Sequence, residues 1–340
     1  MRRRRSRQPS WPTSSPGDFG YNCIVNSSLT LSGAPVSLRA TGALRRRQYT
    51  ERAARLLLGA AAAVSIITTV LIVISLLEPT VEFFDVVSIK EFFTSFKWAP
   101  LFKPARFGVM PIVLGTLWVA FIAILVAVPT GLGAAFYLSE YAKPRVRKVI
   151  KPILELLAGV PTIVFGFFAL SFVNPELVKR FWPGGGVGAY SALGAGLVTG
   201  LMIMPIVASL SEDAMAAVPH SLRHGAFALG SSKREVCTKV VFPAAISGIV
   251  AATVLAVSRA VGETMIAILA SGQQPNISKN PGVGMQTMTG FIGSAGSGDL
   301  ATGTIGYKTI FAVGAYLFVV TFILNLLSIR IVRRFRQVYE

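Results

Sequence analysis

The stretch from residue 107 to residue 139, FGVMPIVLGTLWVAFIAILVAVPTGLGAAFYLS, decides the fold class, because none of its 33 residues is charged. A helix needs about 20 apolar residues to cross a hydrocarbon core of roughly 30 Å, so this stretch is long enough to cross with tilt. Only 14% of the 340 residues are charged, against about 25% in soluble domains. The chain is therefore predicted to be an all-α, polytopic membrane protein.

Comparable apolar windows recur along the chain. They predict six transmembrane helices at about residues 54–77, 108–139, 152–174, 187–210, 246–270 and 309–333. Backbone polar groups in lipid must pair within their own segment, which favours helices here. The membrane domain is predicted to cover residues 54–336, with a long loop, residues 211–245, between the fourth and fifth helices.

Lys and Arg are spread unevenly around these helices. Of the 33, 24 lie before the first helix, in the loops after the second and fourth helices, and at the C-terminal end. Short basic loops stay on the cytoplasmic side, so both termini are predicted to be cytoplasmic. The net charge of +18 is then explained by anionic membrane lipid rather than by nucleic acid.

Residues 1–53 differ in composition from the rest. They contain the run Arg2–Arg5 and many Ser, Pro and Gly residues, with no apolar periodicity. This pattern predicts a disordered basic cytoplasmic tail, and a translation start assigned too far upstream is an alternative that the sequence leaves open. Two cysteines and two histidines, far from any ligand-like spacing, predict no disulfide framework, no metal site and no cofactor.

The loop at 211–245 carries helix signals of its own. Pro219 divides it, Gly230 is suited to close a helix, and Ser232 followed by Glu235 predicts a capping box. Small and apolar residues between Pro219 and Gly230 would then form a helix exposed to the cytoplasm. Such a surface is a candidate docking site for another protein, and an interfacial helix lying on lipid is the alternative.

Several motifs in this order resemble those of ATP-binding-cassette (ABC) importer permeases, and among them the C-type permease of phosphate-specific transport (Pst) systems. The resemblance runs from about residue 52 to residue 336. The residues that carry it are WAP (98–100), FGVMP (107–111), GTL (115–117), PTGLGAAFYLSE (129–140), LAGVP (157–161), SLSEDAMAAVP (209–219) and SRAVGET (258–264). The resemblance implies a type I (MetI-like) permease core in a bacterial cytoplasmic (inner) membrane.

The resemblance also implies a coupling loop that contacts an ATPase. The family's loop typically reads Glu-Ala-Ala, three residues, Gly, and a later Pro, and here His224 and Gly225 replace the Glu and the first Ala. By this resemblance the ATPase-coupling residues are His224, Gly225, Ala226, Phe227, Ala228, Leu229, Gly230 and Pro243. The two departures leave the small-residue face in place and remove the family's charged contact.

The same resemblance implies a set of partners. These are a dimer of a separate ATPase subunit (PstB-like), a second permease subunit (PstA-like) and an extracytoplasmic phosphate-binding protein (PstS-like). The chain has no GxxxxGK[S/T] phosphate loop of its own. It is therefore predicted to be a transport subunit that catalyses no covalent reaction, with ATP hydrolysis by the partner.

Two charges interrupt the fifth predicted helix. Arg259 and Glu263 are spaced i,i+4, which would place them on one helix face. A charge at this depth costs about 3 kcal/mol on insertion scales, so both are expected to face the protein interior or a wet pathway. Arg259 is predicted to contact phosphate in transit, with Glu263 holding the guanidinium when the pathway is empty. A purely structural ion pair is the alternative.

The function predicted from these observations is that of a permease subunit of an ATP-driven importer of inorganic phosphate. Another oxyanion, such as molybdate or sulfate, is an alternative cargo, because all are recognised by the same chemistry. An ion-coupled secondary transporter is the alternative mechanism, which would show internal repeats and several acidic groups at mid-membrane. The sequence shows no repeat and one such acid, Glu263.

Overall fold

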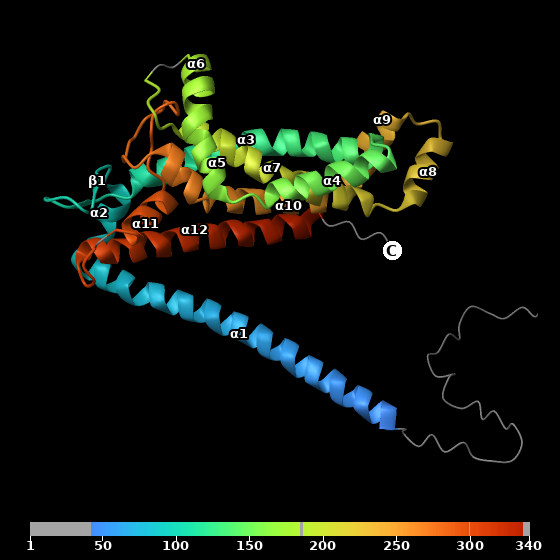
Figure 1. Cartoon of the computed structure of the whole chain (residues 1–340), viewed down its shortest axis with the longest axis horizontal. Helices are drawn as coiled ribbons and strands as arrows, with labels where there is room; N and C mark the ends of the chain where they lie inside the picture. The colour runs from blue at the N-terminus through green and yellow to red at the C-terminus, as the bar shows by residue number, and fades with distance from the viewer. Residues whose placement is uncertain (1–41, 184–185, 299, 336–340) are drawn as a thin grey trace, which may run out of the picture. The chain divides into compact units, whose positions relative to one another are not determined.

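The computed structural model describes residues 42–183, 186–298 and 300–335. Most of the predicted tail, residues 1–41, lies outside this part of the chain. Residues 42–53, which the sequence placed in the tail, form the beginning of the first helix instead. Figure 1 shows the elements, whose bounds follow.

The helices and strands, in chain order, are α1 (Gly42–Val86), α2 (Ile89–Thr94), β1 (Trp98–Ala99), β2 (Arg106–Phe107), α3 (Met110–Phe136), η1 (Tyr137–Tyr141), α4 (Pro144–Ala158), α5 (Thr162–Phe168), η2 (Ala169–Val178), α6 (Lys179–Phe181), α7 (Ala192–Ala216), α8 (His220–Ala228), α9 (Lys233–Glu235), η3 (Val236–Val241), α10 (Phe242–Val261), η4 (Ala267–Ser271), α11 (Met288–Gly296) and α12 (Ile305–Phe335). The four η elements are π-helical turns continuous with α-helices. Such turns place one extra residue in the helix and often mark functional regions.

The chain divides within α1 into two units, residues 1–66 and 67–340, and each is described by itself. In the described part of the first unit, α1 exposes its apolar side chains, with Leu56 75% and Ile66 66% exposed. Side chains of this kind are stable when lipid or another protein covers them.

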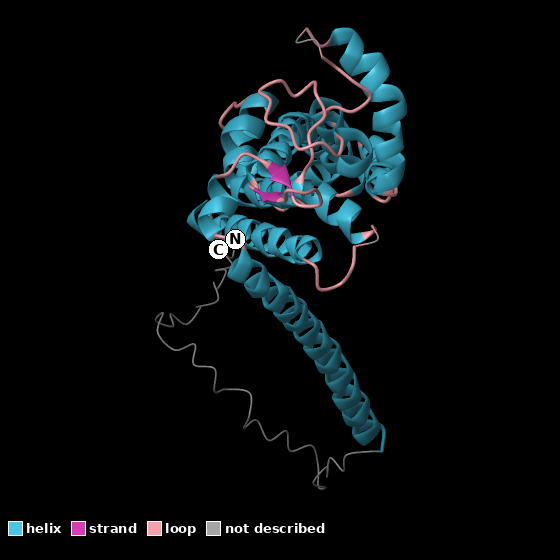
Figure 2. Ribbon diagram, turned by 90° about the vertical axis from the view of Figure 1, so that its left-hand side faces the viewer, coloured by secondary structure: helices cyan, strands magenta, loops and turns pink. Residues whose placement is uncertain are grey.

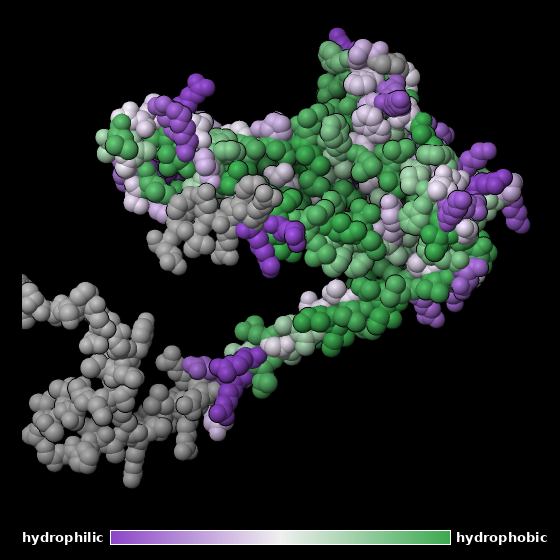
Figure 3. Space-filling model, turned by 180° about the vertical axis from the view of Figure 1, so that it is seen from behind, coloured by the Kyte–Doolittle hydropathy of each residue, from purple (hydrophilic) through white to green (hydrophobic). Residues whose placement is uncertain are grey.

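Within the described residues, six helices are long and apolar enough to cross a membrane, as predicted. They are Tyr49–Val86, Met110–Tyr141, Thr162–Phe181, Ala192–Ala216, Lys233–Val261 and Ile305–Arg333. In Figure 3 the surface of the second unit is green over most of its middle, and purple, hydrophilic side chains gather toward its ends. This is the distribution that a lipid environment requires.

The core of the second unit is built around α3 and α7, which pack against each other along most of their length. Gly196 and Gly200 are one turn apart on α7, and a Cβ at either position would come within 2.8 Å of α3 atoms. This spacing of small residues lets two helix backbones approach closely in a membrane. Buried apolar residues such as Val119 and Met202 complete the interface.

The third predicted helix, 152–174, is broken in the structure. It consists of α4, which ends at Ala158, and a second helical stretch from Thr162 to Phe181. Pro161 has no backbone N–H to donate, so the break falls where the helix would lose a hydrogen bond. In Figure 1, α4 runs alongside α3, α7 and α10, whereas α5 turns away from that direction.

The fifth predicted helix, 246–270, begins earlier and ends earlier than expected. α9, η3 and α10 form a continuous helical stretch from Lys233 to Val261. After Gly262, residues 263 and 264 are not helical, and a new short helix follows from Met265 through η4. The break separates the two charged residues that the sequence had placed on one helix.

At the end of the second unit away from α8, two short strands form a hairpin, shown in magenta in Figure 2. β1 and β2 pair antiparallel, with Trp98 opposite Phe107. The hairpin is fixed by aromatic edge-to-face contacts, including one between Trp98 and Phe291 with ring centroids 4.9 Å apart. Phe83, at the end of α1, belongs to the same buried cluster. This end of the unit is therefore packed like a small protein core.

Candidate functional site

α8 and the residues that follow it carry most of the predicted coupling residues, and they are exposed. Leu229 is 88% and Phe227 45% exposed, while Ala226 is half-buried against the cluster formed by the ends of α3, α7, η3 and α10. The exposed members of the set also include His224, Gly225, Ala228 and Gly230. An apolar surface on so short a helix is available for contact with another protein.

The two turns predicted around this segment are confirmed. Gly230 has φ +81°, and the N–H of Ser231 donates to the carbonyl of Ala226 over 3.2 Å, which closes α8. Ser232 and Glu235 form the predicted capping box at the start of α9. Because its C-terminal end is closed in this way, α8 is presented as a defined helix rather than a loose loop.

Pro243 is not part of α8. It lies near the start of α10, inside the continuous helical stretch that begins at Lys233, and it is exposed. The structure therefore brings seven of the eight predicted coupling residues together in one segment and places Pro243 in another.

The common helix face predicted for Arg259 and Glu263 is not formed. α10 ends at Val261 with Gly262 as its C-cap, so the two residues do not share a helix face. Both belong to the described residues, and no ion pair joins their side chains, although they remain close enough for Arg259 to attract the Glu263 carboxylate. Glu263, 8% exposed, instead accepts a hydrogen bond from the N–H of Ile266 over 3.3 Å. It caps the short helix after the break.

The backbone at this break is also tied to the neighbouring segment. Thr289 Oγ1 donates to the carbonyl oxygen of Glu263 over 2.6 Å, and this hydroxyl is buried. The carbonyl, freed by the end of α10, therefore has a partner. The signal for this geometry was present in the sequence, because a Gly followed by an acidic residue marks one helix end and the next start.

Arg259 has no hydrogen bond or ion pair with any side chain among the described residues. It lies in the last turn of α10 and is partly exposed. Its neighbour Ser258 donates to Asn325 Oδ1 on α12 over 2.9 Å. Asn325 precedes Arg330 by five residues, about 8 Å along a helix, so Arg259 lies inside the apolar region of the bundle.

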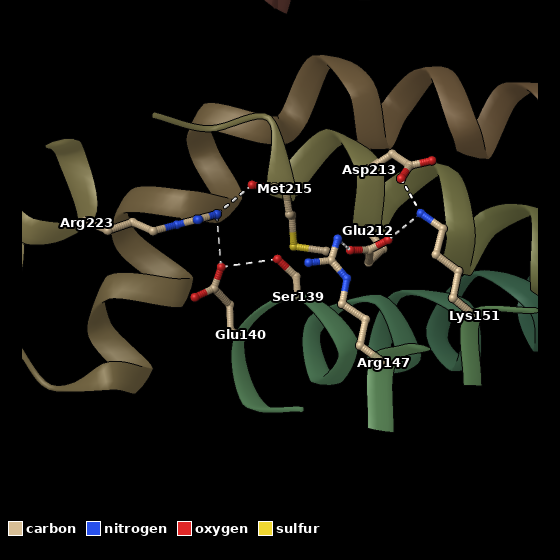
Figure 4. A network of polar contacts seen from close by, with 8 residues as sticks. All are labelled: Ser139, Glu140, Arg147, Lys151, Glu212, Asp213, Met215 and Arg223. Carbon is tan, nitrogen blue, oxygen red and sulfur yellow. Dashed lines mark hydrogen bonds and ion pairs between the residues drawn. The ribbon is translucent and has the colours of Figure 1, made fainter. Parts of the chain in front are cut away.

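A polar network that was not predicted lies at the carboxyl end of α7 (Figure 4). Glu212 is completely buried, yet it carries two cationic partners from α4. Arg147 pairs with Glu212 Oε1, and Lys151 Nζ lies 2.8 Å from Glu212 Oε2. Lys151 also pairs with Asp213, which is largely exposed. The network fixes α4 against α7.

Lys151 remains charged in this network. Burial disfavours its ammonium form, but hydrogen bonds to Asp213 and Glu212 outweigh burial and raise the pKa of Lys151 above its usual 10.5. A raised pKa in a cation means that its contribution to stability is fully present below pH 10.5 and is lost only as the pH rises above that value. The ammonium group is therefore charged at physiological pH.

A second charged contact connects α8 to the same end of α7. Arg223 Nη2 lies 3.2 Å from Glu140 Oε1 in η1 and donates to the carbonyl of Met215 over 2.6 Å. The Arg223 and Glu140 side chains are only 12% and 10% exposed. Figure 4 shows the guanidinium reaching from α8 toward both partners.

In the described part of the chain, no three His, Cys, Asp or Glu side chains lie close enough together to hold a metal ion. A pocket of about 250 Å³ lies beside the hairpin, between Trp98 and Gln286. Its lining is mainly apolar, and neither Arg259 nor Glu263 belongs to it.

Comparisons with known proteins agree with this architecture. The family model of "Binding-protein-dependent transport system inner membrane component" matches residues 127–337. "Probable ABC transporter permease protein YqgH" of Bacillus subtilis is 34% identical over 71% of this chain and 77% of its own length. "Phosphate transport system permease protein PstC" of Mesorhizobium japonicum is 33% identical over 68% of this chain and 75% of its own length.

Among solved structures, a bacterial alginate ABC transporter in complex with an alginate pentasaccharide-bound periplasmic protein contains a chain of similar fold. The match has a TM-score of 0.58 and 16% identity, and it covers 85% of this chain and 98% of the other. The predicted all-α type I permease fold is confirmed, and so is the prediction of a transport component rather than an enzyme. The chain is a multi-pass membrane protein and belongs to the family of binding-protein-dependent transport system inner membrane components.

Proposed function

We propose that the chain is a permease subunit of an ATP-driven importer of inorganic phosphate. The relative from Mesorhizobium japonicum carries a name that states phosphate transport, and it matches this chain over two thirds of its length. This similarity favours phosphate over molybdate or sulfate, and the family favours ATP-driven import over ion-coupled transport. The proposed partners are a second permease subunit (PstA-like), an ATPase dimer (PstB-like) and a phosphate-binding protein (PstS-like).

The distribution of basic residues supports an orientation with α8 in the cytoplasm. The segment up to Arg55, the stretch from Lys143 to Lys151 and the C-terminal end hold most of the Lys and Arg residues. On this orientation the hairpin end faces outward, where a binding protein would deliver substrate. The exposed face of α8, from His224 to Gly230, would then receive the ATPase.

One observation carries the proposed pathway: Arg259 is a cation inside the apolar region that has no hydrogen bond or ion pair with a described side chain, and only a longer-range attraction to Glu263. A guanidinium without a contacting counter-charge is costly there, and an anion in transit would stabilise it. The planar guanidinium can donate two parallel hydrogen bonds to a tetrahedral oxyanion. Arg259 would contact phosphate, and Glu263 would hold the break in the helix that leaves the guanidinium free.

Phosphate import requires an energy source for a simple electrostatic reason. Moving one negative charge against an inside-negative potential costs about 2.3 kcal/mol per 100 mV. Each tenfold of accumulation adds about 1.4 kcal/mol. Passive flow would run outward, so the ATPase partner must drive the uptake through α8.

The pathway is tested by phosphate uptake into liposomes that contain the complete complex with ATP inside. Arg259→Gln is expected to reduce uptake at least tenfold and Arg259→Lys by less, with the complex still assembled. Arg330→Gln, a change at the end of α12, is the matched control and should leave uptake near normal. Near-normal uptake in Arg259→Gln would contradict the assignment of Arg259.

The same liposomes test the cargo and the energy source. Excess molybdate or sulfate should leave phosphate uptake unchanged, and competition by either would reassign the cargo. Accumulation of phosphate by this chain alone, driven only by an ion gradient, would contradict the ATP-driven mechanism.

The docking surface is tested by purification of the complex. Leu229→Glu should remove the ATPase from the purified complex, because Leu229 is 88% exposed and its change disturbs no packing. Ala226→Trp should act in the same direction through added bulk. Phe102→Glu, which changes an equally exposed apolar residue near the hairpin (73% exposed), is the control and should retain the ATPase. Retention in Leu229→Glu would refute the docking assignment.

A further inference from the structure

α8 has few attachments to the rest of the second unit. Most of its side chains are exposed, whereas those of Arg223 and Ala226 are partly buried. Ala226 makes an apolar contact with the cluster at the ends of α3, α7, η3 and α10. Any displacement of α8 must therefore reach the membrane helices through these contacts or through the chain on either side.

The contacts of Arg223 are suited to transmit such a displacement. Its guanidinium meets Glu140, which lies in η1 directly after α3, and the carbonyl of Met215 in the last turn of α7. Carbonyls in the last turn of a helix have no partner within the helix, and a cation there also favours the helix dipole. One side chain of α8 thus holds the ends of two membrane helices.

The Arg223 and Glu140 side chains have few other polar contacts. Its Nε has no acceptor, and its Nη1 lies 3.4 Å from His220 Nδ1, a neighbour on the same helix. Glu140 accepts one further hydrogen bond, from Ser139 next to it in the chain. The contact between Arg223 and Glu140 is therefore the direct charged connection between α8 and α3 in the described part of the chain.

The neighbouring network of Glu212 and Asp213 stiffens the part of α7 that Arg223 contacts. Glu212 and Asp213 fix α7 to α4 one turn before Met215. A force applied at the Met215 carbonyl would thus act on α7 and α4 together, and at Glu140 it would act on α3. Ion pairs with little exposure resist separation more than exposed ones, because a separated charge would stay partly buried.

We propose that the Arg223–Glu140 ion pair transmits the movement of α8 to α3 and α7, which makes Arg223 and Glu140 positioning residues for transport. This inference rests on the proposed function, because it takes α8 as the segment that the ATPase moves. It differs from the docking assignment, since Arg223 points toward the membrane helices and not toward the exposed face.

The test compares transport with ATP hydrolysis in the complete complex in liposomes. Arg223→Gln and Glu140→Gln should leave the ATPase bound and hydrolysing ATP, while phosphate moved per ATP falls at least fivefold. Arg223→Lys should recover part of the ratio, because an ammonium group can still meet Glu140. The double variant should be no worse than either single one, since residues in one contact give non-additive effects.

The matched control is Lys239→Gln, which breaks the exposed ion pair between Lys239 and Glu235 nearby. It should leave the ratio of transport to hydrolysis unchanged. An unchanged ratio in Arg223→Gln would overturn the proposal, and so would additive single effects. Loss of the ATPase from the Arg223→Gln complex would also overturn it, because Arg223 would then be a docking or folding contact.

A distance measurement separates this inference from the identity of the cargo. Nitroxide labels are placed at Ser221→Cys on α8 and Tyr137→Cys in η1, both exposed, in a chain that lacks its two native cysteines. With Arg223 present, ATP should leave the label distance unchanged, because the two elements move together. In Arg223→Gln, ATP should change it. If ATP changes it in both or in neither, the transmission proposal fails, whereas absent phosphate uptake alone would refute only the cargo.

Discussion

The two ends of α7 are held by opposite kinds of chemistry. At the carboxyl end, Glu212 and Asp213 are held by the charges of Arg147 and Lys151 from α4. At the amino end, Ser191 and Asn174 are completely buried and form a neutral hydrogen-bond network. The same helix thus has one end fixed by charged side chains and the other by amide, hydroxyl and backbone groups.

The neutral network is short and involves the backbone of three segments. Asn174 Nδ2 donates to the carbonyls of Ala189 and Ala270, over 2.9 and 3.2 Å. Ser191 donates to Asn174 Oδ1 over 2.7 Å, and its Oγ also accepts from the N–H of Gly194. Hydrogen bonds of this kind need close geometry, whereas ion pairs act over longer distances and tolerate movement. This difference suits an amino end that keeps its position and a carboxyl end at which α7 and α4 move together.

The largest expected effect is at Glu212. Glu212→Gln leaves Arg147 and Lys151 without a buried negative partner and should destabilise the protein by about 3 kcal/mol, at the lower end for buried pairs because both cations reach some water. The measurement is the unfolding free energy in bicelles. Asp213→Asn, at an exposed neighbour, is the control and should cost under about 1 kcal/mol. Equal losses of unfolding free energy in the two variants would show that burial of the carboxylate does not determine the size of the effect.

A smaller loss of stability is expected from changes at the amino end of α7. Asn174→Ala removes three neutral hydrogen bonds and should cost about 2 kcal/mol, because it leaves buried polar groups without partners. Gly194→Ala should act in the same direction, since a Cβ there would overlap with Asn174 Oδ1. Gly188→Ala, where a Cβ would meet nothing within 4 Å, is the matched control for the same bicelle measurement. A neutral Gly194→Ala would show that this end tolerates movement and would weaken the comparison.

Local features of this chain could be predicted from the sequence, because their causes are local. The six apolar helices follow from composition, and the turn at Gly230 and the capping box at Ser232 follow from a few neighbouring residues. The exposed segment from His224 to Gly230 was predicted from a resemblance that also depends on contiguous residues. These features require no knowledge of which helices are neighbours.

The networks that involve charges could not be predicted in the same way. Lys151 and Glu212 are 61 positions apart, and their contact exists only because α4 lies against α7. The predicted pair Arg259–Glu263 failed for the opposite reason, since a continuous helix was assumed where Gly262 ends one. Periodicity places residues on a common face only while the helix continues.

The smallest expected effect concerns the capping box, which lies outside both ends of α7. Ser232→Ala should destabilise the start of α9 by about 1 kcal/mol, because the N–H of Glu235 loses its acceptor. Hydrogen exchange in residues 232–241 should then rise about fivefold, while amides at the two ends of α7 stay unchanged. Ser231→Ala, at a neighbour that takes no part in the box, is the control. A parallel rise in exchange at Met215 would mean that α9 and the carboxyl end of α7 open together. The capping box would then be coupled to the charged carboxyl end of α7 rather than independent of it.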